Sequence, residues 1–270
     1  MTAVLNEIEW AKDKINNNEL GRHPFETLCR VAKYYLADDN GNRQAARCRL
    51  ETFLLRCSPT ASTVLWGDTL DKAVKYAAKN KAVEIEYIPV TDKEMDTIHN
   101  LKGAQLQRLA LTLLCLSKYW NMVNDVDTYW VNSKDNEIMK IANINTSIRR
   151  QCLMYNQLYE AGLVRFSQKI DNTNVQVCFA EDGDIAMKVT RFDNLGYQYK
   201  LFMGDDAYFC CQECGLVVRR ENLTKEGLTS RGRPQIYCRN CAIALRMRRN
   251  VDGVMRDNAG FSSVSSQIIA

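Results

Sequence analysis

The sequence predicts a mainly helical α+β protein made of three modules in series. Three observations predict this class: helical spacing of apolar residues over the first hundred positions, a helix-helix-turn-helix-hairpin order after them, and two CxxC pairs near the C-terminus. We expect a helical domain at 1–100, a winged helix-turn-helix domain at 101–191, a strand bridge with a four-cysteine zinc ribbon and basic helix at 192–256, and a flexible tail at 257–270.

The first hundred residues have the pattern of short amphipathic helices joined by turns. Apolar spacing predicts helices over about 5–15, 25–36, 45–57 and 69–79, followed by a short strand at 83–87. Thr91 and Glu94 have the spacing of a capping box, which predicts the start of a further helix. No catalytic pattern occurs here, and core packing accounts for most of the apolar residues. Docking of a partner is the functional alternative.

Three helices are predicted in the middle segment. A long apolar helix covers Gln105–Trp120, and a shorter one, capped by Ser133, covers 136–141. A third runs to Glu160 from a cap at Asn145 or Thr146, and Gly162 suits the left-handed conformation that ends it.

A hairpin should follow these helices. Apolar and polar residues alternate over 163–167 and 175–179 around a turn at 171–174, which predicts the two strands of a wing. We expect 129–131 to lie in a loop. Two further strands, at 185–189 and 197–202, are expected to bridge to the zinc module.

The first turn of the third helix is the part of a winged helix-turn-helix that would meet base edges. Its hydroxyl, amide and guanidinium groups suit base and phosphate contacts, and two cations on the wing would reach the backbone. The candidate nucleic-acid-binding residues here are Asn145, Thr146, Ser147, Arg149, Arg150, Gln151, Arg165 and Lys169. The same fold also serves as a protein-docking module, and that alternative stays open.

Two CxxC pairs predict a metal site. Cys211 and Cys214 form the first pair, and Cys238 and Cys241 form the second. A CxxC turn directs two thiolates at one point, so two such turns complete the four-sulfur shell of structural Zn²⁺. Gly215 suits a turn that requires positive φ directly after the first pair.

The eleven cysteines also allow interpretations other than a metal site formed by the two pairs. A redox CxxC or two disulfides would also use the paired cysteines, and Cys210 is an extra thiol that could replace Cys211 as a ligand. Six cysteines stand singly among apolar neighbours, and we expect them to be buried and reduced. They are Cys29, Cys48, Cys57, Cys115, Cys152 and Cys178.

Positive charge is concentrated on the cysteine segment. Residues 210–256 carry ten Lys and Arg against four acids, whereas the whole chain has a net charge of +4. Nine of these ten cations are Arg, which binds phosphate through two parallel hydrogen bonds and stacks on bases. The composition therefore favours a nucleic-acid surface over a solvated basic face. The candidate residues are Arg219, Arg220, Arg231, Arg233, Arg239, Arg246, Arg248 and Arg249.

Several classes of protein are disfavoured. The P-loop, dinucleotide-binding, serine-hydrolase and zinc-protease motifs do not occur, and a four-thiolate zinc has no open coordination position, so we expect no enzyme activity. The sequence has no apolar run long enough for a membrane span, and its first residues do not form a signal peptide. We expect a cytoplasmic protein without a membrane partner.

Residues 100–245 resemble a family of bacteriophage and prophage proteins from Gram-positive bacteria. The resemblance is carried by Leu106–Trp120, the run NEIMKIANINTSIRRQCLMYNQLYEAGLV, the stretch Asn194–Tyr199 and the terminal CxxCG…GRPxxYCxxC finger. The Arg231-Gly232-Arg233-Pro234 run before Tyr237 is similar to zinc fingers on DNA-binding proteins of mobile elements. These resemblances imply a phage-encoded role in nucleic-acid binding or regulation.

Two functional hypotheses follow. The first is a DNA-binding protein, a replication accessory factor or transcriptional regulator, that uses the winged helix and the basic structural zinc ribbon. The alternative is an inhibitor or adaptor that binds a protein or ribonucleoprotein, such as a host nuclease, polymerase or helicase; an anti-defence protein is one example. The modest net charge of the whole chain motivates this second hypothesis.

Overall fold

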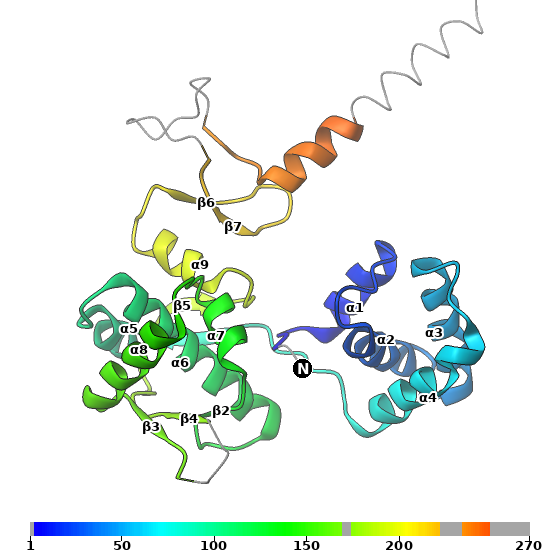
Figure 1. Cartoon of the computed structure of the whole chain (residues 1–270), viewed down its shortest axis with the longest axis horizontal. Helices are drawn as coiled ribbons and strands as arrows, with labels where there is room; N and C mark the ends of the chain where they lie inside the picture. Colours follow the sequence, from blue (N-terminus) through cyan, green and yellow to red (C-terminus); the bar gives the residue numbers. More distant parts are fainter. Residues whose placement is uncertain (1–2, 169–173, 222–233, 249–270) are drawn as a thin grey trace, which may run out of the picture. The chain divides into compact units, whose positions relative to one another are not determined.

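The computed structural model describes residues 3–168, 174–221 and 234–248 (Figure 1). The chain divides into two compact units, residues 1–192 and 193–270. Helices dominate and the strands form only small sheets, so the predicted mainly helical α+β class is confirmed. Among the described helices, none combines the length and the apolarity that a bilayer crossing requires.

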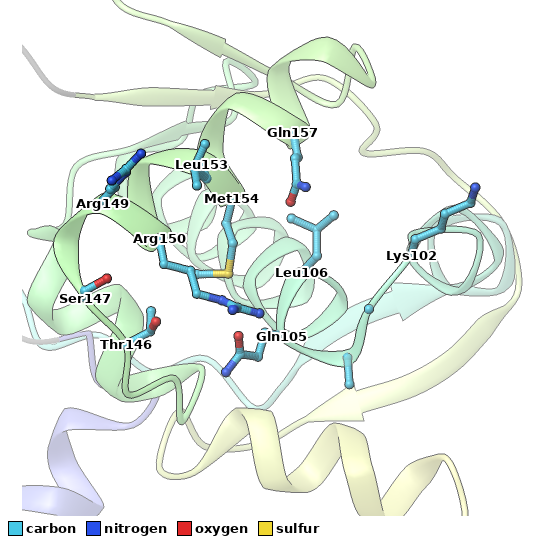
Figure 2. Close-up of a pocket in the computed structure, with 12 residues that line it drawn as sticks. Lys102, Gln105, Leu106, Thr146, Ser147, Arg149, Arg150, Leu153, Met154 and Gln157 are labelled. Carbon is cyan, nitrogen blue, oxygen red and sulfur yellow. The ribbon is translucent and has the colours of Figure 1, made fainter.

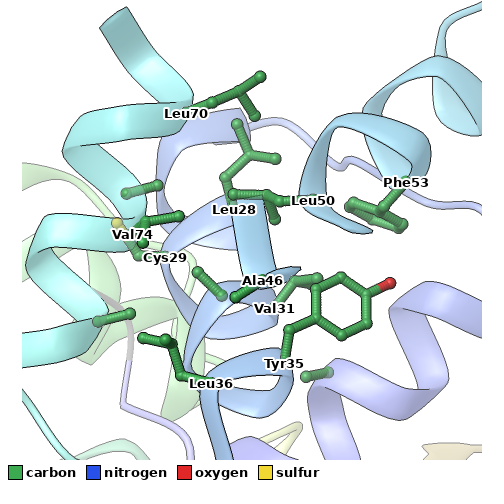
Figure 3. Close-up of a cluster of buried hydrophobic side chains, with 14 of the residues drawn as sticks. Leu28, Cys29, Val31, Tyr35, Leu36, Ala46, Leu50, Phe53, Leu70 and Val74 are labelled. Atoms are coloured by element: carbon green, nitrogen blue, oxygen red, sulfur yellow. The ribbon is translucent and has the colours of Figure 1, made fainter. Parts of the chain in front are cut away.

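Four helices form the first part of the first unit. They are α1 (Glu7–Asn16), α2 (Pro24–Asp38), α3 (Arg43–Cys57) and α4 (Thr63–Lys79). Helix α2 packs against the other three and brings Leu28, Val31 and Leu36 into their shared apolar core (Figure 3).

All four predicted helices are present, but α4 begins at Thr63 rather than near Thr69. The Ser62 hydroxyl accepts a hydrogen bond from the N–H of Leu65, which caps the additional first turn. The sequence analysis did not use this serine as a cap.

A buried cluster of charges joins α1 to α2. The Glu7 carboxylate accepts hydrogen bonds from Arg30 Nε at 3.1 Å and Lys33 Nζ at 2.6 Å, and from the N–H of Val83 at 3.0 Å. The three charged side chains are only 3–5% exposed. Because a buried carboxylate requires such partners, the cluster determines where α1 and the segment after α4 lie against α2.

The strand predicted at 83–87 is wrong. This segment forms only a single bridge, between Glu84 and Asn6, and the strand lies just beyond it as β1 (Ile88–Thr91). Strand β1 pairs with β5 (Ile185–Val189), so β5 is a strand but completes a sheet within the first unit instead of forming a bridge. Alternation of side chains predicts a strand without identifying its partner.

Helix α5 (Asp92–His99) follows β1 directly. The Thr91 hydroxyl accepts from the N–H of Glu94, and the Glu94 carboxylate accepts from the N–H of Thr91, so the predicted capping box is confirmed. Glu94 is fully buried and also accepts a hydrogen bond from Lys118 Nζ at 2.7 Å.

The remainder of the first unit is built around a long helix. Helix α6 (Ala104–Asn124) packs against α7 (Asp135–Ile141) and α8 (Ile148–Glu160). It also contacts a three-stranded antiparallel sheet made of β2 (Trp130–Val131), β3 (Val164–Phe166) and β4 (Val175–Val177). The strand order is β2-β4-β3.

Details of this region differ from the predictions. Residues 130–131 form β2 rather than part of a loop, because their backbone pairs with β4. Lys134 and Ser147 occupy the N-cap positions of α7 and α8, and neither side chain makes a capping hydrogen bond, so the predicted caps at Ser133 and at Asn145 or Thr146 are wrong.

Polar side chains of α6 hold the surrounding segments. Arg108 Nη1 donates to the carbonyl of Asn143, in the turn between α7 and α8, at 3.0 Å. The Asn121 Oδ1 atom accepts from the N–H of Tyr129 at 3.0 Å, directly before β2. Helix α6 therefore determines where both α8 and the sheet lie.

The second unit begins with a helix, α9 (Leu195–Phe202), where the sequence pattern predicted a strand at 197–202. Leu195 and Tyr199 are buried four positions apart, which is a helical spacing that the alternating aromatic pattern concealed. A hairpin of β6 (Tyr208–Cys210) and β7 (Val217–Arg219) follows. Residues 239–248 then form the predicted basic helix, and the predicted tail lies outside the described residues.

The expectation that the six single cysteines are buried is correct for only two of them, Cys29 and Cys115. Cys57 is half-buried, and Cys48, Cys152 and Cys178 are exposed. All are free thiols. Apolar neighbours in sequence did not predict burial, because each exposed cysteine lies on the outer face of its helix or beyond the end of its strand.

Replacing Glu7 by Gln should strongly destabilise the first unit, because Lys33 would lose its buried counter-charge and Arg30 would lose the closer of its two acidic partners, the other being Glu26 at 3.9 Å. We expect a loss of about 3–5 kcal/mol in the free energy of unfolding, measured by chemical denaturation. Glu19→Gln is the matched control, since it breaks an exposed pair with Lys14 and should cost less than about 1 kcal/mol. Equal losses in the two variants would contradict the role of the cluster.

Candidate metal centre and basic surfaces

Four cysteines of the second unit converge on one point. The Sγ atoms of Cys211, Cys214, Cys238 and Cys241 all lie within 4.8 Å of one another. The Sγ atoms of Cys214 and Cys238 are 3.9 Å apart. Four sulfurs arranged tetrahedrally at about 2.3 Å from one ion would lie roughly 3.8 Å apart, so the spacing fits a single metal ion.

The first pair lies in the turn between β6 and β7. The N–H of Gly215 donates to the carbonyl of Cys211 at 2.9 Å, and the N–H of Cys211 donates to the carbonyl of Leu216 at 3.0 Å. Gly215 has a φ of 67°, so the predicted positive-φ turn is confirmed. This tight turn places Cys214 on the same side as Cys211.

The second pair lies at the start of the basic helix. Cys238 directly precedes the helix of 239–248, and Cys241 lies in its first turn, where the N–H of Ala242 donates to the carbonyl of Cys238 at 2.9 Å. The N–H of Cys238 also donates to Cys211 Sγ at 3.2 Å, which joins the two pairs. Two segments separated by a long stretch of sequence thus form one four-sulfur site.

The surroundings favour a negative charge on one sulfur. Burial raises the pKa of the Cys211 thiol, but backbone N–H groups of Cys214, Cys238 and Glu213 donate to its sulfur and together lower that pKa to about 6. The neighbouring Cys238 thiol raises the pKa of Cys241, and burial raises the pKa of Cys214. A bound cation would compensate the repulsion that opposes forming several thiolates here.

Cys210 lies outside this cluster. Its side chain is exposed, and its sulfur lies 3.4 Å from the carbonyl oxygen of Gly215. Successive residues of a strand point to opposite faces, so only Cys211 faces the other three sulfurs. The structure thus brings together the four cysteines predicted as ligands, and none of the eleven cysteines is in a disulfide.

The arginines of this unit fall into two groups. Arg220 Nη1 donates to the carbonyl of Gln235 at 2.8 Å, Arg220 Nε donates to the carbonyl of Asp206 at 2.9 Å, and its guanidinium lies over the ring of Phe209. These contacts connect the end of β7 to the segment before β6 and to the segment before the second cysteine pair, so Arg220 has a structural role that sequence reasoning missed.

The other predicted basic residues of this unit are more accessible. Arg219, Arg239 and Arg246 are exposed, and exposed Arg248 contacts Glu213 at 3.3 Å. Arg231, Arg233 and Arg249 lie outside the described residues.

The first turn of α8 is exposed at most of its predicted positions. Asn145, Ser147, Arg149 and Arg150 are exposed, and Thr146 is half-buried. Gln151 is half-buried, and its Nε2 atom donates to the carbonyl of Thr146 at 3.1 Å, so its amide is engaged within the helix start. Arg165 is exposed on β3, and Lys169 lies outside the described residues.

A groove lies between the start of α6 and α8 (Figure 2), with a volume of about 630 Å³. Lys102 and Gln105 line one side, and Arg149 and Arg150 line the other. Sequence reasoning missed Lys102 and Gln105, because only the packing of α8 against α6 makes them line the same groove as the predicted arginines.

The cysteine cluster should bind about one metal ion per chain, measured by elemental analysis of the purified protein. Cys214→Ser and Cys241→Ser should each reduce the bound metal to near zero, because three thiolates and a hydroxyl hold a thiophilic ion much more weakly. Cys178→Ser is the control, since this thiol is exposed and outside the cluster, and the variant should retain its metal.

Cys210→Ser separates the two possible ligand sets. We expect it to retain the metal, because its sulfur does not join the other sulfurs. Loss of metal in Cys210→Ser together with retention in Cys211→Ser would contradict the cluster seen in the structure.

Comparisons with protein-family models, with curated proteins and with solved structures find no match to this chain.

Proposed function

We propose that this chain is a phage-type DNA-binding protein without catalytic activity. In this proposal residues 104–177 act as a winged helix-turn-helix, with α8 as the recognition helix, and the four cysteines hold a structural Zn²⁺ in a basic ribbon. The observation that carries the proposal is the exposed first turn of α8, where Arg149 and Arg150 form no ion pair with any described residue.

The order of elements supports the winged-helix part of the proposal. Helix α6, strand β2, helices α7 and α8 and the strands β3 and β4 follow one another along the chain, and β3 and β4 form a hairpin directly after α8 in a sheet of order β2-β4-β3. In a helix-turn-helix, the second helix of the motif presents its N-terminal residues to the major groove. Arg108 and Asn143 connect α6 to the turn before α8, which would keep such a helix in a fixed orientation.

The donor set supports zinc as the metal. Four cysteine sulfurs without a histidine or carboxylate favour a thiophilic ion in tetrahedral geometry, which is the usual environment of structural Zn²⁺. With all four positions filled by protein, the metal would contribute folding free energy rather than catalysis. The exposed Arg219, Arg239 and Arg246 would then contact phosphates from the ribbon.

One observation favours a second candidate function, docking of a protein or ribonucleoprotein. Ile148 is 78% exposed and Leu153 is 55% exposed, and both lie on α8 beside the arginines. Arg is enriched in protein interfaces, and the buried centre of an interface is more apolar than the rest of the surface. An adaptor or inhibitor of a host nuclease, polymerase or helicase would use this face of α8.

Binding of the zinc-loaded protein to duplex DNA over a salt series tests the first proposal. If about six phosphates are contacted, the slope of log K against log salt concentration should be near −5. Fluorescence anisotropy of a labelled duplex would give both affinity and slope. Salt-independent binding, or no binding at low salt, would reject this proposal and favour the second candidate.

A paired substitution tests the role of α8. Replacing Arg149 and Arg150 together with Ala should remove sequence preference, with an affinity loss of roughly a hundredfold for a selected site. Lys72→Ala, an exposed residue of α4, is the control and should leave affinity within about twofold. An unchanged preference in the double variant would show that α8 does not read the bases.

A further inference from the structure

We propose that a pocket beside β2 binds one unpaired base of a single-stranded nucleic acid. The pocket is formed by the end of α6 and the outer face of the β2-β4-β3 sheet, and it shares no residue with the groove beside α8. The inference goes beyond the proposed function, which concerns duplex DNA and the first turn of α8.

The strand register defines the outer face of the sheet. The valines of β2, β3 and β4 are all buried, so the residues that alternate with them face outward. Pairing places Trp130 opposite Gln176, and Gln176 opposite Arg165. An indole, an amide and a guanidinium therefore form one row across the three strands.

A second outward row follows next to the first. The Nδ2 atom of Asn174 donates to Asn132 Oδ1, and the N–H of Ser167 donates to the carbonyl of Asn174 at 3.0 Å. The ladder thus continues beyond the ends of the strands, and these three residues lie side by side. All three line the pocket together with Trp130.

The lining of the pocket combines aromatic and uncharged polar groups. Trp120, from the last turns of α6, and Trp130, from β2, both line it, and the other lining side chains are amides, hydroxyls and one valine. Among the described residues that line it, none is charged. Its volume of about 330 Å³ is at the small end of ligand pockets. Such a lining suits one uncharged ring that stacks on an indole, and disfavours a phosphate or a metal ion.

Hydrogen-bonding atoms of the pocket remain available to a ligand. Asn124 Nδ2 donates to the carbonyl of Trp120 at 2.8 Å, and Asn132 Oδ1 accepts from Asn174. The opposite amide atoms, Asn124 Oδ1 and Asn132 Nδ2, have no partner among the described residues, and neither has Trp130 Nε1. Both asparagines are exposed. One acceptor and two donors beside an aromatic face match the edge of a base, which is free only where the base is unpaired.

Arg165 favours a base on a strand over a neutral sugar. It is exposed and forms no ion pair with a described residue. Since neighbouring strands lie about 4.8 Å apart, its backbone lies roughly 10 Å from that of Trp130, two strands away. A strand whose base enters the pocket carries phosphates that a guanidinium at this place could bind, whereas a neutral sugar would leave Arg165 unused.

The test uses the full-length, zinc-loaded protein and a labelled single-stranded DNA of mixed sequence, with an abasic strand of equal length as the second probe. Affinity is measured by fluorescence anisotropy across a salt series. The abasic strand should bind roughly five- to 150-fold more weakly than the normal strand, and Trp130→Ala should weaken binding of the normal strand by a similar factor. Trp130→Phe, which keeps an aromatic face, should recover most of this loss.

The salt slope separates the base from the phosphate. Trp130→Ala removes no charge and should leave the slope unchanged, whereas Arg165→Ala should make it shallower by about 0.7. Asn132→Asp is a second variant, at an exposed position, that places a negative charge in the pocket and should also weaken binding. It decides the matter if Trp130→Ala lowers the thermal midpoint. Phe25→Ala, an exposed aromatic residue of α2, is the control and should stay within about twofold of wild-type.

Several outcomes would overturn the pocket without touching the proposed function, which the duplex assay tests separately. These are equal binding of the normal and abasic strands, unchanged affinity in both Trp130→Ala and Asn132→Asp, and no binding of single strands at low salt. A free nucleoside that binds as tightly as the strand would overturn a strand as the ligand. Loss of duplex binding alone, with base-dependent binding of single strands retained, would reject the proposed function and support the pocket.

Discussion

Helix α6 is buried along most of its length, and a polar group buried there is stabilised when it binds a neighbouring segment. Arg108 binds the turn before α8, Lys118 binds buried Glu94, and Asn121 binds the backbone before β2. Each hydrogen bond satisfies a group of α6 and at the same time fixes a neighbouring segment. The position of α8, and with it the basic groove, depends on this requirement.

The second unit is limited in a different way, because few apolar residues are buried in its described part. Its buried residues within the described part of the chain are few, chiefly Leu195, Tyr199, Phe209 and Val217 together with Cys211 and Cys238. Units with so small a core generally require a metal or disulfides to hold their fold. The four-sulfur cluster joins the hairpin to the helix of 239–248, so a bound ion would replace the missing apolar packing.

The basic residues of this protein differ in whether their side chains are already bound by other residues. Arg220 is used to close a loop and to cover Phe209, and Arg30 and Lys33 neutralise Glu7 inside the first helices. Arg149 and Arg150, by contrast, lie exposed beside a groove that contains no acid. The number of positive charges is therefore a poor measure of a binding surface. Their partners determine which charges remain available to a ligand.

Much of this structure is local and could be predicted from the sequence. The helices over 24–57 and 148–160, the capping box at Thr91 and the left-handed Gly162 follow from apolar spacing and cap chemistry within a few residues. The spacing of the two CxxC pairs likewise identified the four cysteines that converge, because each pair forms its own turn.

Other features were decided only by tertiary structure. The pairing of β1 with β5, the short strand β2 and the helix at α9 depend on contacts between distant segments, which no local pattern contains. The same holds for the groove. Gln105 and Arg150 are far apart in sequence, and only the packing of α8 on α6 makes them line the same groove.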